Sequence, residues 1–184
     1  MPAATQFPEA HLAAQHDADR VLSALHTDRV ADHLLAGRPA PGPRQTAVTL
    51  RALSDFPLCI RILPLSDRRH RGGDRVTGVS HYLARFADHL AHRDVRTTYE
   101  PEYWILGEPV TERLLRIVAK SDPAPEDRPT SRQVAAVLLA LADTEALELP
   151  RRLVEVAGDG DLPWNGATGI GRFLRSLADR VAAR

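Results

Sequence analysis

The stretch "LPWNGATGIGRFLRSLADRVAAR", residues 162–184, runs three glycines directly into a segment that carries arginines. Asn-Gly pairs favour positive φ angles, so "PWNGATG" predicts a sharp turn, and Thr168 predicts the start of a final helix. The apolar side chains of that helix recur at helical spacing on one face. They are Ile170, Phe173, Leu174, Leu177 and Val181. We expect this face to pack against apolar residues 134–141 and the arginines to remain at the surface.

The glycines at 166, 169 and 171 do not predict a phosphate cradle. A dinucleotide fingerprint has the order G-x-G-x-x-G after a strand, with an acidic residue about 20 positions further on. Here the order is reversed, no strand is predicted before it, and no P-loop lysine follows. We therefore predict no cofactor for this stretch.

Upstream, "SDPAPEDRP" (121–129) contains three prolines and predicts a linker. Thr130 and Gln133 form a capping-box pair that predicts the start of the next helix. Residues 130–184 thus predict a C-terminal three-helix unit that resembles a helix-turn-helix arrangement. Its charge is divided, because residues 164–184 carry a net +3 and residues 122–161 a net −5.

Residues 1–120 predict a helical N-terminal region with a small sheet or hairpin. Helices are expected over 8–36, 79–93 and about 110–120, with a Pro/Gly-rich loop at 37–44. "LCIRIL" (58–63) alternates like a half-buried strand, and "VRTTY" (95–99) and "YWIL" (103–106) read as two strands joined by a turn. The residues 46–53 fit either a strand or a helix. The predicted fold class is therefore α+β, predominantly helical, with a small antiparallel sheet.

The amphipathic segment 79–93 indicates a possible nucleic-acid surface. Its apolar face carries Val79, Tyr82, Leu83, Phe86 and Leu90, and its polar face carries His81, Arg85, His89 and His92. A cationic helix followed by a hairpin is the order of a winged-helix element. The nucleic-acid-binding residues predicted here and in the C-terminal helix are Arg68, Arg69, Arg71, Arg75, Arg85, Arg172, Arg175 and Arg180. The alternative interpretation is that these arginines only solvate the surface.

Composition limits the class of protein. The 184 residues contain 24 basic and 24 acidic side chains, which excludes a uniformly basic coat and leaves only a local nucleic-acid patch. Cys59 is the single cysteine, so neither an intrachain disulfide nor a cysteine-based zinc cluster forms. No apolar run or leader is evident, and we expect a cytoplasmic protein without a membrane partner. Lys120 is the only lysine, a bias typical of GC-rich bacterial-like coding sequences.

Metal binding is not predicted. His89 and His92 stand three residues apart and could share an ion, but a third ligand cannot be identified from the sequence. The single "HD" pair at 16–17 matches a helical hydrolase motif only at chance level. We predict no metal and no catalytic residue.

One enzyme family offers an alternative. The stretch "CIRILPLSDRRHRGGDRVTGVSHYLARFADHLAHRDVRTTY" resembles the strand, arginine/glycine loop, helix and strand at the core of acyl-CoA N-acetyltransferases. The resemblance implies that loop amides hold the pyrophosphate of acyl-CoA at a helix N-terminus.

The leading functional hypothesis is a non-enzymatic module that binds nucleic acid or serves in an assembly. The alternatives are an acyl-CoA-dependent N-acetyltransferase-like enzyme and a purely structural protein-interaction subunit. Nucleic acid, a protein partner or a second copy of the chain are the partners that these hypotheses allow.

Overall fold

The computed structural model describes residues 7–27, 30, 35, 37–67, 75–91, 112–121, 124–143, 147–158 and 163–184. Within these residues every regular element is a helix and no strand is present. The predicted α+β class with a small antiparallel sheet is therefore wrong. The hairpin predicted over 95–99 and 103–106 lies outside the described residues.

The described residues form the following regular elements in chain order. They are α1 (Phe7–Ala24), α3 (Pro43–Leu53), α4 (Phe56–Asp67), α5 (Arg75–Ala91), a helical segment over 112–121, the 3-10 turn η2 (Pro125–Asp127), α7 (Ser131–Ala142), α8 (Glu148–Ala157) and α9 (Pro163–Ala182). Helix α3 begins with proline at a position where its missing N–H costs nothing.

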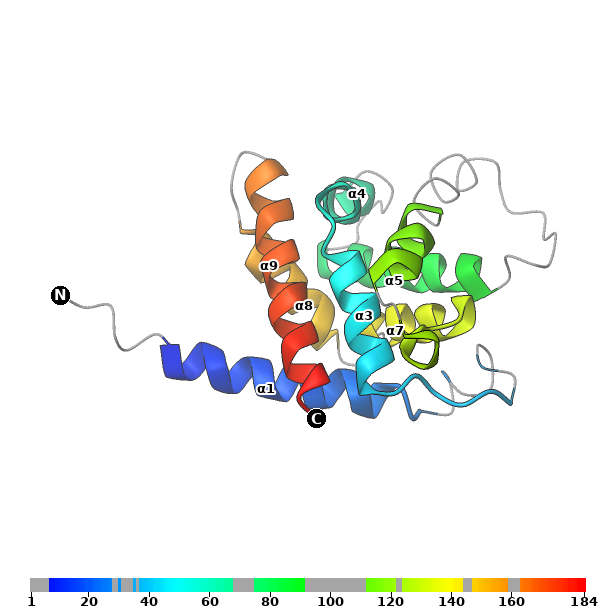
Figure 1. Ribbon diagram of the computed structural model, residues 1–184. Helices are drawn as coiled ribbons and strands as arrows, with labels where there is room; N and C mark the ends of the chain where they lie inside the picture. The colour runs from blue at the N-terminus through cyan, green and yellow to red at the C-terminus, as the bar shows by residue number, and fades with distance from the viewer. Residues whose placement is uncertain are drawn as a thin grey trace.

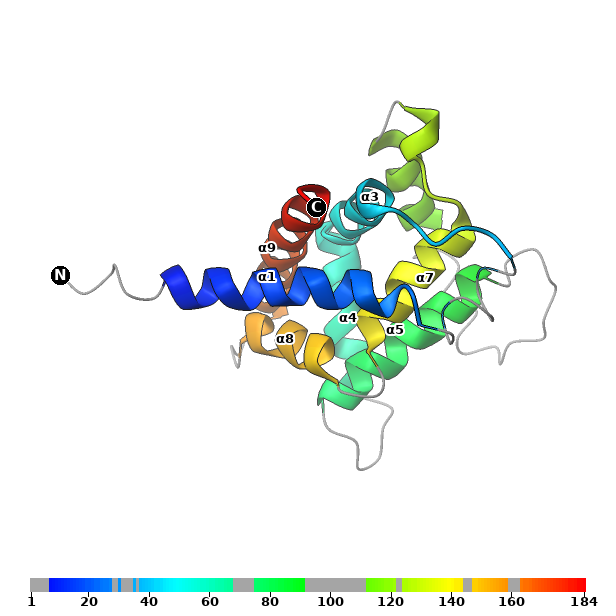
Figure 2. The ribbon, with the colours of Figure 1, turned by 90° about the horizontal axis from the view of Figure 1, so that it is seen from below.

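Helices α3 and α9 lie side by side and run in opposite directions, and α1 lies across one end of the pair (Figure 1). Helix α7 lies along α5, on the other side of the molecule from α9 (Figures 1 and 2). Helix α9 packs on α3, α4, α8 and α1, whereas α7 packs chiefly on α5. The most extensive packing of α9 is thus on α3, while the α7 residues predicted as partners of its apolar face belong to the same buried cluster.

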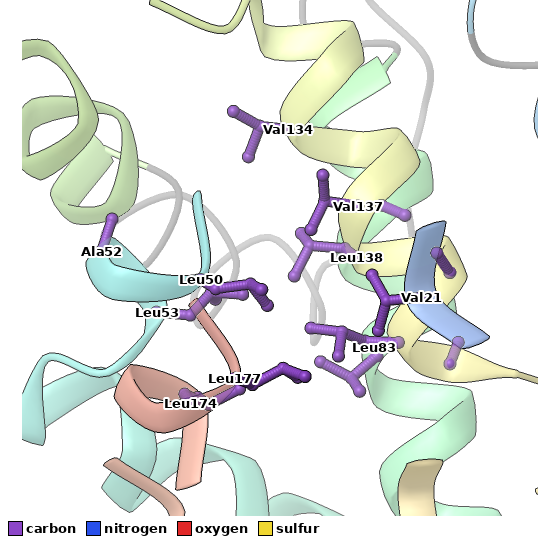
Figure 3. Close-up of a cluster of buried hydrophobic side chains, with 14 of the residues drawn as sticks. Val21, Leu50, Ala52, Leu53, Leu83, Val134, Val137, Leu138, Leu174 and Leu177 are labelled. Atoms are coloured by element: carbon purple, nitrogen blue, oxygen red, sulfur yellow. The ribbon is translucent and has the colours of Figure 1, made fainter. Parts of the chain in front are cut away.

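A single apolar cluster joins these helices. Figure 3 shows side chains from α1, α3, α5, α7 and α9 converging on it, among them Val21, Leu50, Leu83, Val137 and Leu177. All five are buried, with at most 1% of each residue exposed. The exception in the predicted α9 face is Phe173, which is only half-buried at the edge of the cluster.

The strand predicted over 58–63 is part of helix α4. Leu58, Cys59 and Ile62 are buried while Arg61 is exposed, which is the i, i+1, i+4 pattern of a helix face. A short apolar run fits both periods, and the packing of α4 against α5 and α9 decides between them.

The ambiguous stretch 46–53 is also helical. Its β-branched threonines are fully buried, and their hydroxyls donate to carbonyls one turn earlier: Thr46 to Gly42 at 2.8 Å and Thr49 to Gln45 at 3.1 Å. These bonds satisfy the hydroxyls within α3 itself, so the helix can be buried without another polar partner.

The turn predicted at "PWNGATG" is wrong, because α9 is continuous from Pro163 through Gly166, Thr168 and Gly169. Its glycines serve close packing. A Cβ built on Gly169 would overlap the carbonyl oxygen of Val156 in α8, and one on Gly171 would lie 3.1 Å from the carbonyl oxygen of Ser54. Because these residues lack a side chain, α9 approaches the backbone of two neighbours closely.

The predicted capping box is confirmed. The backbone N–H of Gln133 donates to Thr130 Oγ1 at 3.3 Å, and the backbone N–H of Thr130 donates to Gln133 Oε1 at 2.9 Å. Gln133 also donates through Nε2 to Gln45 Oε1 at 3.4 Å, which links the starts of α7 and α3. The described part of the predicted linker contains η2 and irregular residues. The division of the chain into domains at 121–129 stays a prediction.

The face predicted for α5 is largely confirmed. Val79, Leu83, Phe86 and Leu90 are buried, and Arg85 is exposed. Tyr82, predicted buried, and His81, predicted exposed, are both half-buried. The side chains of His89 and His92 lie outside what the structure describes.

Candidate nucleic-acid interface

Charged side chains surround Ser54 and Asp55, the two residues that connect α3 to α4 and that we call the α3–α4 corner. The Ser54 hydroxyl donates to the carbonyl of Arg51 at 2.6 Å and so closes the last turn of α3. The Asp55 carbonyl accepts the N–H groups of Leu58 and Cys59, both at 3.0 Å, and opens α4. These local bonds fix the positions of Ser54, whose side chain contacts α9, and of Asp55, whose side chain contacts the helical segment 112–121.

The Asp55 carboxylate accepts two hydrogen bonds from Arg113, from Nε at 2.6 Å and from Nη2 at 3.1 Å. This bidentate geometry matches the planar guanidinium fork, and the bond to Asp55 raises the pKa of Arg113. One turn away, Arg51 Nη2 lies 2.9 Å from Asp179 Oδ1 of α9, with both side chains at least half exposed. Each of the two aspartates at this corner therefore has an arginine partner.

Two arginines of α9 complete the surface. Arg175 donates from Nε to the Ser54 hydroxyl at 3.1 Å, so its partner is neutral. Arg172, one turn earlier, is exposed, and no hydrogen bond or ion pair to it is found among the described residues. We call Arg51, Arg113, Arg172 and Arg175 the arginine cluster; together with Asp55 and Asp179 it carries a formal charge of +2.

The close approach of α9 positions this cluster. Gly171 faces both the Ser54 carbonyl and Cys59 Sγ, which would lie 3.1 and 3.8 Å from a Cβ built there. The Cys59 thiol is fully buried and donates to the Leu53 carbonyl at 3.3 Å. Burial, assisted by the Asp55 charge, raises the pKa of Cys59 to about 12. Cys59 is thus part of the packing beneath the cluster and not a nucleophile at neutral pH.

The predicted binding residues do not form one surface. Arg68, Arg69 and Arg71 lie outside the described residues. Arg75 and Arg85 belong to α5, which packs on α4, α7 and α8 away from the exposed face of α9. Arg180 of α9 is half-buried, so Arg172 and Arg175 are the predicted residues that the structure brings to the cluster.

Sequence reasoning missed Arg51 and Arg113. Their partners are 128 and 58 residues away along the chain, at Asp179 and Asp55, so no local pattern marks them. The only available signal was negative: neither is on the apolar face of its helix. The Arg51–Asp179 pair depends on the packing of α3 against α9, and the Arg113–Asp55 pair depends on the segment 112–121 lying against the connection between α3 and α4.

A second polar network joins α1 to α7 and α8. Arg20 lies 2.7 Å from both Asp143 and Glu148, and Arg152 lies 3.3 Å from Asp17 and 2.7 Å from Glu155. Burial raises the pKa of Asp17, and the Arg152 charge opposes that rise. The network positions α1 and carries no exposed cationic excess.

In the described part of the chain, no three histidine, cysteine or carboxylate side chains are grouped so that they could hold an ion. None of the helices in this part is both long and apolar enough to cross a membrane.

The strand on which the resemblance to acyl-CoA N-acetyltransferases begins, at 58–63, is helical in α4. The fold in the described residues therefore does not support that resemblance. Comparison of the chain with protein-family models, curated proteins and solved structures gave no match.

Proposed function

We propose that the protein is a binding module that attaches to nucleic acid through the arginine cluster. The observation that carries the proposal is the charge arrangement around Arg172 and Arg175. Both arginines are exposed, and the two carboxylates of this surface, Asp179 and Asp55, are already paired with Arg51 and Arg113. Arg172 and Arg175 are therefore not neutralised by Asp179 or Asp55.

Guanidinium groups bind phosphate oxygens through short, charge-assisted and often bidentate hydrogen bonds. Arg172 and Arg175 stand three residues apart on one helix, so their side chains extend from neighbouring points of the same face. A row of phosphates is the ligand that presents several such acceptors in sequence. Phosphate contacts carry no direct base information, so we expect binding with little sequence preference.

The number of cations also sets the expected affinity. Two to four phosphate contacts are few, so the dissociation constant should fall near the range of about 10⁻⁴ to 10⁻⁶ M that is typical of non-specific binding. Salt should weaken binding steeply, since each contact releases condensed counterions. Measurements at low ionic strength are therefore needed to detect the complex.

The test is a fluorescence anisotropy titration of labelled DNA with the full chain at two salt concentrations. Arg172→Ala and Arg175→Ala should each weaken binding and flatten the slope of log K against log [salt] by about 0.7–0.9. Arg151→Ala is the matched control, because Arg151 is an exposed arginine on α8 outside the cluster. Circular dichroism of each variant checks that the fold is kept.

The proposal is overturned if the wild type binds neither duplex nor single-stranded DNA at low salt. It is also overturned if Arg151→Ala weakens binding as much as the two cluster variants do. That result would mean that any surface cation contributes equally and that the cluster has no special role.

A further inference from the structure

Arg51 of α3 contacts the face of α9 that carries Arg175. The backbone carbonyl of Arg51 accepts the Ser54 hydroxyl at 2.6 Å, and the same hydroxyl accepts a hydrogen bond from Arg175 Nε at 3.1 Å. Arg51 Nη2 lies 2.9 Å from Oδ1 of Asp179, which stands one helical turn beyond Arg175 on α9. Helices α3 and α9 lie side by side (Figure 1). A third guanidinium group therefore lies on this face, held by a carboxylate of α9.

The two ion pairs of the arginine cluster differ in how firmly they are held. Arg51 and Asp179 are joined by a hydrogen bond from Nη2 to one carboxylate oxygen, and their side chains are 50% and 71% exposed. Arg113 and Asp55 are joined by two hydrogen bonds, and the Asp55 side chain is only 24% exposed. An exposed pair contributes little to stability because water and salt screen it, whereas a bidentate pair is stronger. A phosphate can therefore replace Asp179 on Arg51 more readily than it can replace Asp55 on Arg113.

We infer that Arg51 is a third phosphate-binding residue of the proposed site and that Asp179 restrains it, an inference that rests on the proposed function. In the free protein the Asp179 carboxylate occupies the Arg51 guanidinium. When nucleic acid binds, a phosphate replaces this carboxylate, and Asp179 becomes solvated. A phosphate suits the exchange because it offers a guanidinium group charged acceptor oxygens in bidentate geometry. The complex gains one phosphate contact and loses one exposed ion pair.

A double-mutant cycle of Arg51→Ala and Asp179→Asn tests the exchange, with binding of labelled DNA to the full chain measured by fluorescence anisotropy. Asp179→Asn should tighten binding by up to about fivefold, because the exposed pair no longer has to be broken. Arg51→Ala should weaken binding, and its effect should be larger in the Asp179→Asn background by the same factor. In that background it should also flatten the slope of log K against log [salt] by about 0.7–0.9, the loss of one phosphate contact.

The order of the two Arg51 effects distinguishes exchange from simple neutralisation. If Arg51 only neutralises Asp179, then Arg51→Ala leaves an unpaired acid beside the phosphates in wild type, and it changes little when Asp179→Asn is also present. An Arg51→Ala effect that is larger in wild type, or equal in the two backgrounds, therefore overturns the inference. Circular dichroism of each variant checks that the fold is kept.

Glu155→Gln is the matched control, because it also removes one negative charge from an exposed carboxylate that pairs with an arginine, here Arg152 on α8. It should tighten binding less than Asp179→Asn does, and an equal effect would show that only net charge matters. If the cycle fails while Arg172→Ala and Arg175→Ala weaken binding, the inference is wrong and the proposed function stands. If wild type binds no nucleic acid, the proposed function fails and the inference fails with it.

Discussion

Gly169 of α9 faces the backbone of Val156 in α8, and a Cβ built on this glycine would overlap the Val156 carbonyl oxygen and lie 3.0 Å from its carbon. Both groups belong to helix backbones, so neither can move aside as a flexible side chain would. The contact therefore fixes how closely α8 and α9 pack. It also explains why a glycine occupies the interior of a helix, where it normally lowers stability.

The first prediction is that Gly169→Ala destabilises the protein. Gly→Ala within a helix ordinarily stabilises by about 0.5–1 kcal/mol, but here relief of the overlap requires α8 to shift, at a cost of about 1–3 kcal/mol. Urea denaturation followed by circular dichroism measures the difference. Gly42→Ser is the control, since nothing lies within 4 Å of a Cβ at Gly42 and serine is a favoured N-cap residue. A Gly169→Ala variant as stable as wild type would contradict the close approach.

A second prediction compares two residues of α9 that the sequence places on one apolar face. Leu177 has 0% exposure, whereas Phe173 is half-buried. Leu177→Ala should cost about 2–5 kcal/mol, because it leaves a cavity in the cluster. Phe173→Ala should cost less, although the ring is larger, because water can fill part of the space. Urea midpoints of both variants test the order, and a larger loss for Phe173→Ala would reverse it.

Helix-specific signals in the sequence predicted parts of the fold correctly. The face of α5 and the Thr130–Gln133 capping box are confirmed because each depends only on neighbouring residues of one helix. Local rules succeed where the physical cause is local.

The errors share a physical cause that the sequence does not display. The residues 58–63 alternate like a strand, but α5 and α9 cover two sides of this segment and favour a helix. The glycines of α9 read as turn residues, but packing against Val156 and Ser54 requires small residues within a helix. In both cases a tertiary partner determines the outcome, and for Gly171 that partner, Ser54, is more than 100 residues away along the chain.

Only the part of the candidate site that depends on a single helix could be predicted from the sequence. The exposure of Arg172 and Arg175 followed from the helical period of the C-terminal segment. Asp179 pairs with Arg51 and Asp55 pairs with Arg113, so neither carboxylate is paired with Arg172 or Arg175. This arrangement requires the packing of three distant segments. Whether a charged helix is neutralised by its neighbours is a property of the fold and not of the helix.

A third prediction concerns the thiol. Cys59 is fully buried, and burial raises its pKa to about 12, so almost no thiolate exists at pH 8. The native protein should therefore react with Ellman's reagent far more slowly than the protein in denaturing urea. The measurement is direct because the chain has one cysteine. Rapid, stoichiometric reaction of the native protein would show that the α3–α4 corner opens readily.

The last prediction concerns the pH dependence of stability. Burial raises the pKa of Asp17 above its ordinary value, while the Arg152 charge, whose Nε lies 3.3 Å away, lowers it by less. The folded state thus binds the proton more tightly than the unfolded state does. The Asp17 carboxyl therefore stabilises the folded state most at acidic pH, and this stabilisation is lost as the pH rises through the raised pKa of Asp17. Above that value the folded protein bears the full cost of a buried charge.

Asp17→Asn removes the cost of burying the Asp17 charge. The asparagine keeps a side-chain oxygen that can accept a hydrogen bond from Arg152, and Arg152 keeps its ion pair with Glu155 at 2.7 Å. The variant should therefore be more stable than wild type at pH 7. The difference in stability between the two proteins should shrink as the pH falls from the raised pKa of Asp17 to its ordinary pKa. Thermal unfolding of both proteins across that range measures the gap. Asp19→Asn is the control, because exposed Asp19 pairs with Arg184 at 2.9 Å and should change stability by less than about 1 kcal/mol. If Asp17→Asn is instead less stable at pH 7 and recovers in acid, the pairing with Arg152 outweighs burial and the sign of the pKa shift is the opposite.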